Sequence, residues 1–473
     1  MRQARFFRRI IIVIITFSGL ILPAVSVRGA ASAAAILGAA PSVSVRGGFP
    51  ASAAAILGAA PSVSVRGGFP ASAASVGASR PLPYSRNGAP ARYSRKLALS
   101  AKNFADTIEI EWERGQVYVP VEMGGRHYRF LFDTGAAQSV VYADTPIEGS
   151  KAAGYIRSHD AVGTVNQVPM VILPPMTLGH ITIRGCQATV QQRPVQQRPV
   201  QQRPVQQRPK GWQADGILGF NIINSGLLAK IDVRQRLLIL TDRKKFFNHE
   251  QGFDTRYMLK FFVPYLEASP FGNYREPVLF DTGSRRLYAM NRQSFDACAA
   301  MAGSAIDSQV EGRSMGRHAI GHFGVEPLSE VVFLHLSRFR VCSVDFCNLH
   351  TLTTQGESHV GAAILEYGAM IINPRKKRMR FQPFANIPVS VDNEQLDIAF
   401  VADHGMPCVG LVWEQGEPYR RGFRQGDIIV AIDGNEVSSF SQFVAWPFII
   451  GHEHRFTVRG SDGRLHDIHW IRL

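Results

Sequence analysis

A five-residue sequence that occurs twice constrains this chain most. Leu131–Gly135 reads Leu-Phe-Asp-Thr-Gly, and the same residues return as Leu279–Gly283. In each copy an apolar, strand-like run leads into Asp-Thr-Gly, where glycine permits a tight turn. Strand-like segments also precede both copies, at Gln116–Met123 and Tyr257–Leu266. The repetition therefore predicts two tandem lobes made mostly of β-strands.

The two aspartates of this repeat, Asp133 and Asp281, suggest acid–base chemistry. If the two loops face each other, their carboxylates come within hydrogen-bonding reach. Like charges that close cannot both ionise, so the pair holds one proton between them. The ionised member is then a general base for a water molecule, and the protonated member is an acid for a substrate carbonyl. This chemistry needs neither a metal nor a cofactor, so we expect none.

Residues 105–385 resemble a retropepsin-type, pepsin-like two-lobed aspartic protease with both lobes on one chain. The resemblance implies a mostly β fold of two tandem retropepsin-like β-barrel lobes forming one acid protease unit. It implies an aspartic-type endopeptidase, a hydrolase acting on a peptide or protein substrate. Because both half-sites lie on one chain, a monomer is sufficient for the active site. The residues that the resemblance implies are the catalytic Asp133 and Asp281 and the supporting Thr134, Gly135, Thr282, Gly283, Ser284, Asp215 and Gly219.

The supporting residues have distinct implied roles. Thr134 and Thr282 would hydrogen-bond across the lobe interface, and Asp215–Gly219 matches the family's hydrophobic-hydrophobic-glycine element behind the first loop. A Ser284 hydroxyl can donate to Asp281, so we expect Asp281 to be the ionised partner. The flap over the substrate is expected near Val162–Thr164 in lobe 1, with a counterpart at Gly316–Gly321 in lobe 2.

The second lobe departs from the family pattern. Gly361–Glu366 reads Gly-Ala-Ala-Ile-Leu-Glu where Ile-Leu-Gly is expected. Either Ala362–Ile364 replaces the element, or Glu366 stands at the glycine. This departure leaves open which residues support the turn of Asp281 from behind. It favours the alternative function, a catalytically inactive peptide-binding or scaffold protein with the protease fold.

The C-terminal segment carries a separate pattern. Gly422–Gly434 contains Gly, three residues, Gly-Asp-Ile-Ile and then Ile-Asp-Gly. This pattern resembles a bacterial-type PDZ domain. Such domains bind an extended chain end by adding it as a strand to a sheet edge. The resemblance implies a peptide site at Cys408, Val409, Gly410 and Leu411; the alternative is a PDZ domain that only packs on the protease or mediates assembly.

The basic charge of the chain lies outside its expected folded body. The formal net charge is +15, but residues 1–100 contain twelve Arg or Lys and no acid, and 190–210 add five more cations. Since 15 − 12 − 5 leaves −2, the remainder is nearly neutral. A nucleic-acid-binding domain needs its basic residues gathered on a folded face, so we expect no nucleic acid partner.

The N-terminus has the features of an export signal. Four arginines precede the apolar run Ile10–Val25, and small residues follow it. This pattern is typical of a cleaved secretory signal peptide, with an uncleaved anchor as the alternative. We therefore expect export to the periplasm or cell envelope of a bacterium, or secretion, with membrane attachment only through such an anchor.

Repeats mark the remaining boundaries. Residues 31–50 recur identically at 51–70, and Val-Gln-Gln-Arg-Pro occurs four times at 190–209. Alanine-, glycine- and proline-rich repeats without a strand or helix period indicate linkers and exposed loops. The expected parts are a signal peptide or N-terminal anchor at 1–30, a low-complexity repeat linker at 31–100, lobe 1 at 101–248 with its repeat insertion at 190–209, lobe 2 at 249–388 and a PDZ domain at 389–473.

Cysteines and histidines give weaker signals. The chain has five cysteines, an odd number, without zinc-site spacing. Cys342 and Cys347 are close enough in sequence for a local disulfide, and the alternative is that the cysteines are small buried hydrophobic residues. No third ligand with suitable spacing accompanies His318 and His322, so no metal site is predicted.

Overall fold

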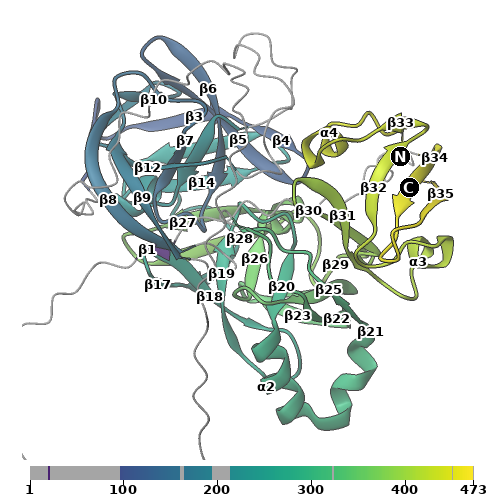
Figure 1. Ribbon diagram of the computed structural model, residues 1–473. Coiled ribbons are helices and arrows are strands. Elements are labelled where there is room, and N and C mark those ends of the chain that lie inside the picture. The colour runs from purple at the N-terminus through teal and green to yellow at the C-terminus, as the bar shows by residue number, and fades with distance from the viewer. Residues whose placement is uncertain are drawn as a thin grey trace, which may run out of the picture. The chain divides into compact units, whose positions relative to one another are not determined.

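The computed structural model describes residues 20–21, 96–159, 165–193, 214–321, 324–449 and 451–471. These residues form four β-sheets and a few short helices (Figure 1). Most of the expected signal peptide and linker lies outside the described residues. Within them, no helix is long and apolar enough to cross a membrane.

Sheet 1 contains the first Asp-Thr-Gly and sheet 2 contains the second. The strands of sheet 1 are β1 (Leu20–Ile21), β2 (Ala98–Leu99), β4 (Glu111–Glu113), β5 (Gln116–Met123), β6 (Arg126–Asp133), β7 (Ser139–Tyr142), β8 (Lys151–His159), β9 (Val165–Ile172), β10 (Met176–Leu178), β11 (Ile181–Arg184), β12 (Gln187–Gln191) and β13 (Gly216–Gly219). Those of sheet 2 are β17 (Met258–Lys260), β18 (Val263–Ser269), β19 (Glu276–Asp281), β20 (Tyr288–Asn291), β21 (Val310–Gly316), β22 (Ser329–Leu336), β23 (Phe339–Val341), β24 (Val344–Cys347), β25 (Leu349–Thr354), β26 (His359–Gly361) and β29 (Val389–Ser390).

The two sheets repeat one strand order. Sheet 1 runs β8-β9-β12-β7-β13-β6-β5-β10-β11, and sheet 2 runs β21-β22-β25-β20-β26-β19-β18-β23-β24. Each strand that carries an aspartate, β6 or β19, lies between its hairpin partner and a parallel strand from later in the chain. The duplication seen in the sequence therefore extends to the topology, and it places the two Asp-Thr-Gly turns at equivalent ends of equivalent strands.

A third sheet, here called the bridging sheet, joins the two halves of the chain. Its strands are β3 (Ala105–Glu109), β14 (Leu228–Asp232), β15 (Leu237–Thr241), β16 (Phe253–Arg256), β27 (Gly368–Asn373) and β28 (Arg378–Pro383). At its centre β14 pairs antiparallel with β27, so that Ile231 lies opposite Met370. One hydrophobic core includes Phe132 of sheet 1, Phe280 of sheet 2 and Ile231 and Ile372 of the bridging sheet. The two strands that lead into the Asp-Thr-Gly turns are thus anchored in a shared core.

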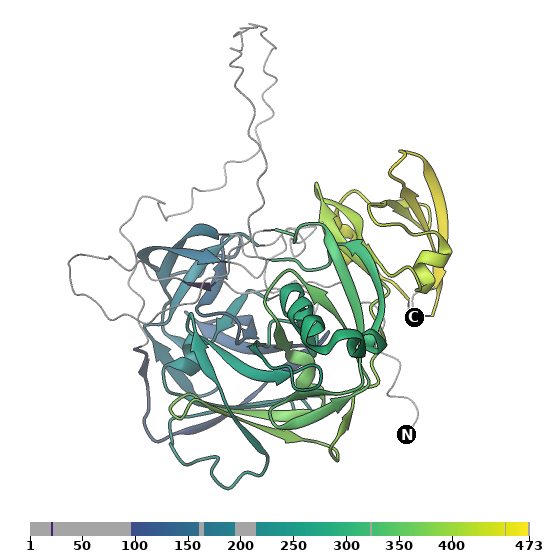
Figure 2. The same cartoon turned by 90° about the horizontal axis from the view of Figure 1, so that it is seen from below.

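The principal helix lies beside sheet 2. The Asn291 side chain accepts hydrogen bonds from the backbone N–H groups of Gln293 and Ser294, which caps α2 (Arg292–Ala302). The helix ends at Gly303, whose φ of 58° suits glycine. Phe295 and Cys298 are its buried residues, and α2 packs against β20 and β25 (Figure 2). The other short helices are α1 (Asn221–Asn224), η3 (Gly303–Gln309), η4 (Ala362–Glu366), α3 (Glu417–Arg421) and α4 (Phe440–Val444).

The C-terminal sheet has its own core but is not independent of sheet 2. Its strands are β30 (Ile398–Asp403), β31 (Met406–Val412), β32 (Ile428–Ile432), β33 (Asn435–Glu436), β34 (Glu453–Arg459) and β35 (Leu465–Ile471). One face packs around Phe423, Phe440 and Phe456. On the other face Leu411 joins a cluster with Phe333 of β22. We call this contact the seam; it also contains the hydrogen bond from Arg317 N to Gly410 O, 2.8 Å.

Two segments that were expected to be free loops pack against the fold in the parts that the structure describes. The first copy of the Val-Gln-Gln-Arg-Pro array is part of the fold: Val190 and Gln191 are in β12, and Arg193 is 3% exposed, with its Nε 2.9 Å from Asp144. Only the array beyond Arg193 lies outside the described residues. The expected second flap segment, Gly316–Gly321, is not free either, because Arg317 bonds to β31 in the seam. Val162–Thr164 lies outside the described residues, between β8 and β9.

All five cysteines are free thiols, so Cys342 and Cys347 form no disulfide. Four of the five are buried, namely Cys186, Cys298, Cys342 and Cys408. The interpretation as small hydrophobic residues therefore fits these four.

Candidate active site

The two Asp-Thr-Gly turns lie in the interior, and each orients its own aspartate. Asp133 and Asp281 are both 0% exposed. Asp133 Oδ1 accepts hydrogen bonds from Gly135 N at 2.9 Å and Ala136 N at 3.1 Å. Asp281 Oδ1 accepts from Gly283 N at 2.9 Å. Backbone donors thus fix Oδ1 of each carboxyl group.

The two threonines join the turns reciprocally. Thr134 Oγ1 donates to Phe280 O at 2.6 Å and accepts from Thr282 N at 3.1 Å. Thr282 Oγ1 donates to Phe132 O at 2.7 Å and accepts from Thr134 N at 3.0 Å. Each hydroxyl satisfies one donor and one acceptor of the opposite turn in a site without water access, so four hydrogen bonds fix the spacing of the two loops.

Gly135 shows how closely the loops approach. A Cβ atom at this position would lie 2.7 Å from Cγ of Asp281, which leaves room for no side chain. Burial raises the pKa of Asp281 well above its ordinary value, and the charge of Asp133 and a side-chain hydrogen bond with Asp133 raise it further. Burial and the neighbouring Asp133 thus both favour the protonated form of Asp281.

This direction is the reverse of the expectation that Ser284 would make Asp281 the ionised partner. Ser284 Oγ lies 3.0 Å from Nε2 of His359, and Nδ1 of His359 lies 2.9 Å from Glu357 O. A carbonyl only accepts, so Nδ1 carries the proton and Nε2 accepts from the Ser284 hydroxyl. The expectation was wrong because the only proton of this hydroxyl is directed to His359. Burial lowers the pKa of His359 to about 4, which keeps the ring neutral at neutral pH.

Strand pairing identifies the supports behind the two turns. In the parallel pair β13–β6, Gly219 is the partner of Asp133. In the parallel pair β26–β19, Gly361 is the partner of Asp281. A Cβ atom on Gly219 would lie 2.5 Å from Gln138 O, and one on Gly361 would lie 2.3 Å from Arg286 O. Both positions therefore require glycine.

Both readings of the Gly361–Glu366 segment are thus corrected. The element behind Asp281 is His359-Val360-Gly361, and its glycine is the first residue of the segment. Glu366 and Ala362–Ile364 belong instead to η4, the counterpart of α1. The equivalence extends to the backbone: Phe220 N bonds to Ala136 O in the first half, and Ala362 N bonds to Ser284 O in the second.

Asp215 acts further from the aspartates. Its carboxylate accepts from Arg129 N at 3.0 Å, and its own N donates to Arg129 O at 2.7 Å. Asp215 therefore fixes the entry of β13 alongside β6, four residues before Asp133, and supports the first turn through the strands.

Gln116 is a supporting residue that the sequence did not reveal. It begins β5 in sheet 1 and is 2% exposed. Its Nε2 donates to Gly283 O of the opposite turn at 2.7 Å, and its Oε1 accepts from Arg285 Nε at 3.1 Å. A polar residue at the start of an otherwise apolar strand was the available signal, but its partner lies far away in sequence.

The four residues expected to bind peptide in the C-terminal segment do not form an open site. Cys408, Val409 and Leu411 are at most 1% exposed, and Gly410 is also buried. Their strand, β31, lies between β30 and β32 and has no free edge. This prediction was wrong because the other face of β31 packs against sheet 2 in the seam.

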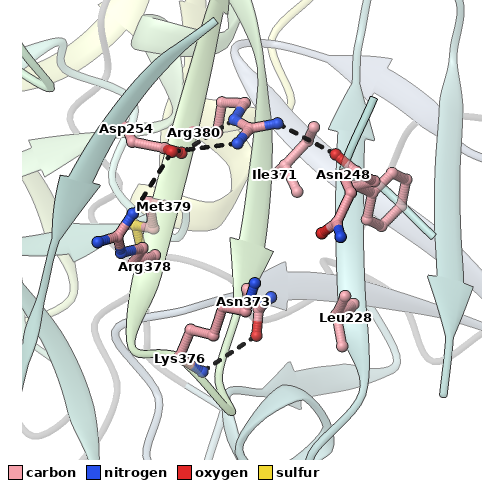
Figure 3. A pocket seen from close by; sticks show the side chains of 10 residues that line it. Leu228, Asn248, Asp254, Ile371, Asn373, Lys376, Arg378, Met379 and Arg380 are labelled. Carbon is pink, nitrogen blue, oxygen red and sulfur yellow. Dashed lines mark hydrogen bonds and ion pairs between the residues drawn. The ribbon is translucent and has the colours of Figure 1, made fainter. Parts of the chain in front are cut away.

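A cavity of about 80 Å³ lies at the bridging sheet, and neither Asp133 nor Asp281 lines it. Figure 3 shows the side chains that line this cavity. Leu228, Ile371 and Met379 line it together with charged residues. Arg380 is bonded to Asp254 at 2.9 Å across its rim. Arg378 and Arg380 both pair with Asp254, the one acid among its lining residues, so this cavity offers no pair of carboxyl groups like that of the two turns.

Residues 119–222 match the family model described as aspartyl protease. The fold is aspartic protease-like. The match contains the first Asp-Thr-Gly and Gly219 and ends before the second turn. Beyond the match, the second half repeats the strand order of the first and bonds to its turn.

Two solved structures are similar at a lower level. Basic 7S globulin from soybean is 8% identical, with a TM-score of 0.35, over 59% of this chain and 94% of its own. The aspartic proteinase from Irpex lacteus is 14% identical, also with a TM-score of 0.35, over 59% of this chain and 97% of its own. These likenesses are too weak to add to the family match. No curated protein matches the sequence.

Proposed function

We propose that this chain is an aspartic endopeptidase, a two-lobed enzyme in which Asp133 and Asp281 activate a water molecule to hydrolyse peptide bonds. The observation that carries the proposal is the reciprocal set of four hydrogen bonds between Thr134 and Thr282 and the opposite turns. This set supports a site in which two carboxyl groups share one proton.

We assign a role to each carboxyl group from its environment. Asp281, with its raised pKa, is the acid that donates a proton to the carbonyl oxygen of the scissile bond. Asp133, with two backbone donors on Oδ1, is the base that takes a proton from the attacking water. The water oxygen bonds to the carbonyl carbon and gives a tetrahedral diol. Asp133 then passes the proton it took to the peptide nitrogen, the C–N bond breaks and the amine leaves. One diol hydroxyl returns its proton to Asp281, so the other product carries a new carboxyl group and both aspartates regain their starting states.

The alternative, a catalytically inactive peptide-binding or scaffold protein, loses its main support. Its best argument was the atypical Gly361–Glu366 segment. Gly361 occupies the position behind Asp281 that Gly219 occupies behind Asp133, so both turns have equivalent backing. The hydrolytic function is therefore favoured.

We also propose that the enzyme is exported and that residues 398–471 form a PDZ-like module. The arginine-rich start and the following apolar run support export. Within the described residues, β30 and β35 are the edge strands of the C-terminal sheet, and Phe400 of β30 packs on Phe443 of α4. A chain end that docks in this module would add along β30, which differs from the site expected from the sequence.

The function is tested with Asp133→Asn and Asp281→Asn in the purified chain, using a short peptide substrate. Each variant should lose hydrolysis while keeping its circular dichroism spectrum and cooperative melting. A chelator should leave short-peptide hydrolysis in place, and activity per molecule should not fall on dilution. Near-normal hydrolysis by either folded variant would disprove the paired-carboxyl mechanism.

A further inference from the structure

Three side chains with metal-binding atoms meet on sheet 2, away from the two turns. Glu311 comes from β21, His335 from β22 and His350 from β25. Their potential ligand atoms all lie within 4.8 Å of one another. We propose that these residues form a site for a divalent transition-metal ion of the Zn²⁺ class, with a structural role.

Strand register creates this cluster. His335 and His350 are directly opposite in the antiparallel pair β22–β25. Their rings are stacked, with centroids 4.2 Å apart and an interplanar angle of 6°. Glu311 is the extra residue of a β-bulge between Val310 and Gly312, and such a bulge re-aims a side chain. All three side chains are therefore held by backbone pairing rather than by a loop.

The ligand set matches the chemistry of zinc. Two imidazoles and one carboxylate are a common three-residue zinc set, which leaves a fourth tetrahedral position for water. With metal–ligand bonds of about 2.1 Å, tetrahedral ligand atoms lie about 3.4 Å apart. The potential ligand atoms lie within 4.8 Å of one another, so the widest pair would have to draw together by up to about 1.4 Å on binding. Nδ1 of His350 and Oε2 of Glu311 are already 2.9 Å apart, and the ion would replace the proton between them.

Outer contacts orient the ligands. Gln395 Nε2 donates to Glu311 Oε2 at 2.8 Å and to Thr351 O at 3.0 Å. Asn393 pairs with the backbone of His350 through bonds of 2.9 and 2.8 Å. Such second contacts fix the direction of ligand side chains and raise metal affinity. Asn393 and Gln395 both belong to the segment that leads into β30.

The location gives the ion its role. The side chains of Glu311 and His350 are each 23% exposed, so an ion has access from solvent. Because Gln395 and Asn393 hold the same groups, a bound ion would strengthen the attachment of residues 393–395 to sheet 2, next to the seam. Neither Asp133 nor Asp281 belongs to the cluster, so this site is separate from the proposed hydrolytic chemistry.

The test uses the full chain, stripped with a chelator and titrated with Zn²⁺ by calorimetry. The wild type should bind one ion per chain at this site, and its melting temperature should rise with Zn²⁺ concentration. His335→Ala, His350→Ala and Glu311→Gln should each lose this binding. His127→Ala, an exposed histidine on β6, is the matched control and should bind as the wild type does.

Two further variants make the result decisive. Gln395→Leu keeps all three ligands and should weaken binding about 10–100-fold, the effect of losing a second-shell contact. Asp133→Asn should bind Zn²⁺ normally, which separates this site from the active turns. If one ligand variant fails to fold without metal, Glu311→Gln and Gln395→Leu still decide. The proposal is overturned if the wild type binds no Zn²⁺, or if the folded ligand variants bind it as well as the wild type.

Discussion

Gly361 lies opposite Asp281 in the parallel pairing of β26 with β19. The same relationship joins Gly219 to Asp133 in the other half. In each case the absence of a side chain lets one strand end press against the backbone that follows the aspartate. The equivalence identifies the glycine behind each turn, and it makes Gly361 a sharper target for mutation than Glu366.

Gly361→Ala should impair the second turn. Its Cβ would lie 2.3 Å from Arg286 O and 2.6 Å from Ser284 O, both backbone atoms that cannot rotate away. We expect a loss of about 1–3 kcal/mol in the free energy of unfolding, typical of overpacking, and a fall in kcat. Gly324→Ala is the matched control, since nothing lies within 4 Å of its added Cβ. Equal effects of the two substitutions in urea denaturation would contradict this role.

Thr134→Ala should separate the two turns. It removes a donor to Phe280 O and an acceptor for Thr282 N, both buried. Leaving a buried polar group unpaired costs about 1–3 kcal/mol, and the aspartates lose their fixed spacing. Thr134→Ser keeps the hydroxyl and should retain most of the stability and kcat. The measurement is unfolding free energy with peptide turnover, and the serine variant behaving like the alanine variant would argue against the hydrogen bonds.

Asp281→Asn should change how stability depends on pH. The pKa of Asp281 is raised in the fold, so its favourable contribution is complete below the ordinary aspartate pKa of about 3.9. That contribution is lost as the pH rises through the raised pKa. The neutral variant escapes this loss, so its stability relative to the wild type should increase with pH. A difference that stays constant from acid to neutral pH would count against a raised pKa.

His359→Gln should change pH dependence in the opposite sense. The pKa of His359 is lowered to about 4 by burial, whereas the unfolded chain protonates near 6.5. Stability from this group is present above pH 6.5 and is lost as the pH falls toward 4, by about 3 kcal/mol in total. Glutamine cannot take up a proton and keeps an acceptor for Ser284. Parallel stability curves for wild type and variant across this window would refute the assignment.

Truncation after Pro388 should lower stability without removing the active turns. It strips β29 and the whole C-terminal sheet, exposing Phe333 and Leu352 in the seam. The four hydrogen bonds that join the two turns involve none of the removed residues. Short-peptide hydrolysis should therefore persist below the new melting temperature. An unchanged melting temperature would show that the seam does not form, and loss of hydrolysis in the folded truncate would give the C-terminal sheet a direct role.

The sequence was most informative where a short motif dictates local geometry. The repeated Asp-Thr-Gly identified both turns and the threonine pair, because these residues act within a few positions of each other. The support behind Asp281 was missed because His359-Val360-Gly361 shares only its glycine with Ile217-Leu218-Gly219. Gly361 has no room for a side chain because backbone oxygens of Ser284 and Arg286, in the loop between β19 and β20, lie too close to it. The residues next to Gly361 in the sequence give no sign of that contact.

Other features depended on packing between distant segments. Cys408 to Leu411 have the pattern of a strand, but their burial in the seam depends on residues near Phe333. Glu311, His335 and His350 have no recognisable spacing, because two strand registers and a bulge bring them together. Gln116 is known as a support only from its bond to Gly283. Such relationships follow from the topology, which the motifs alone did not specify.

The bridging sheet affects how the chain reaches its folded state. Its central pair joins β14, made early in synthesis, to β27, made more than a hundred residues later. Until β27 emerges from the ribosome, β14 has an unpaired backbone edge beside an apolar face. Because β14 and β27 hold equivalent places in the two halves, a waiting β14 is also complementary to β14 of another nascent chain. Premature pairing between two growing chains is thus a specific route to misassembly, and prompt completion of the second half protects against it.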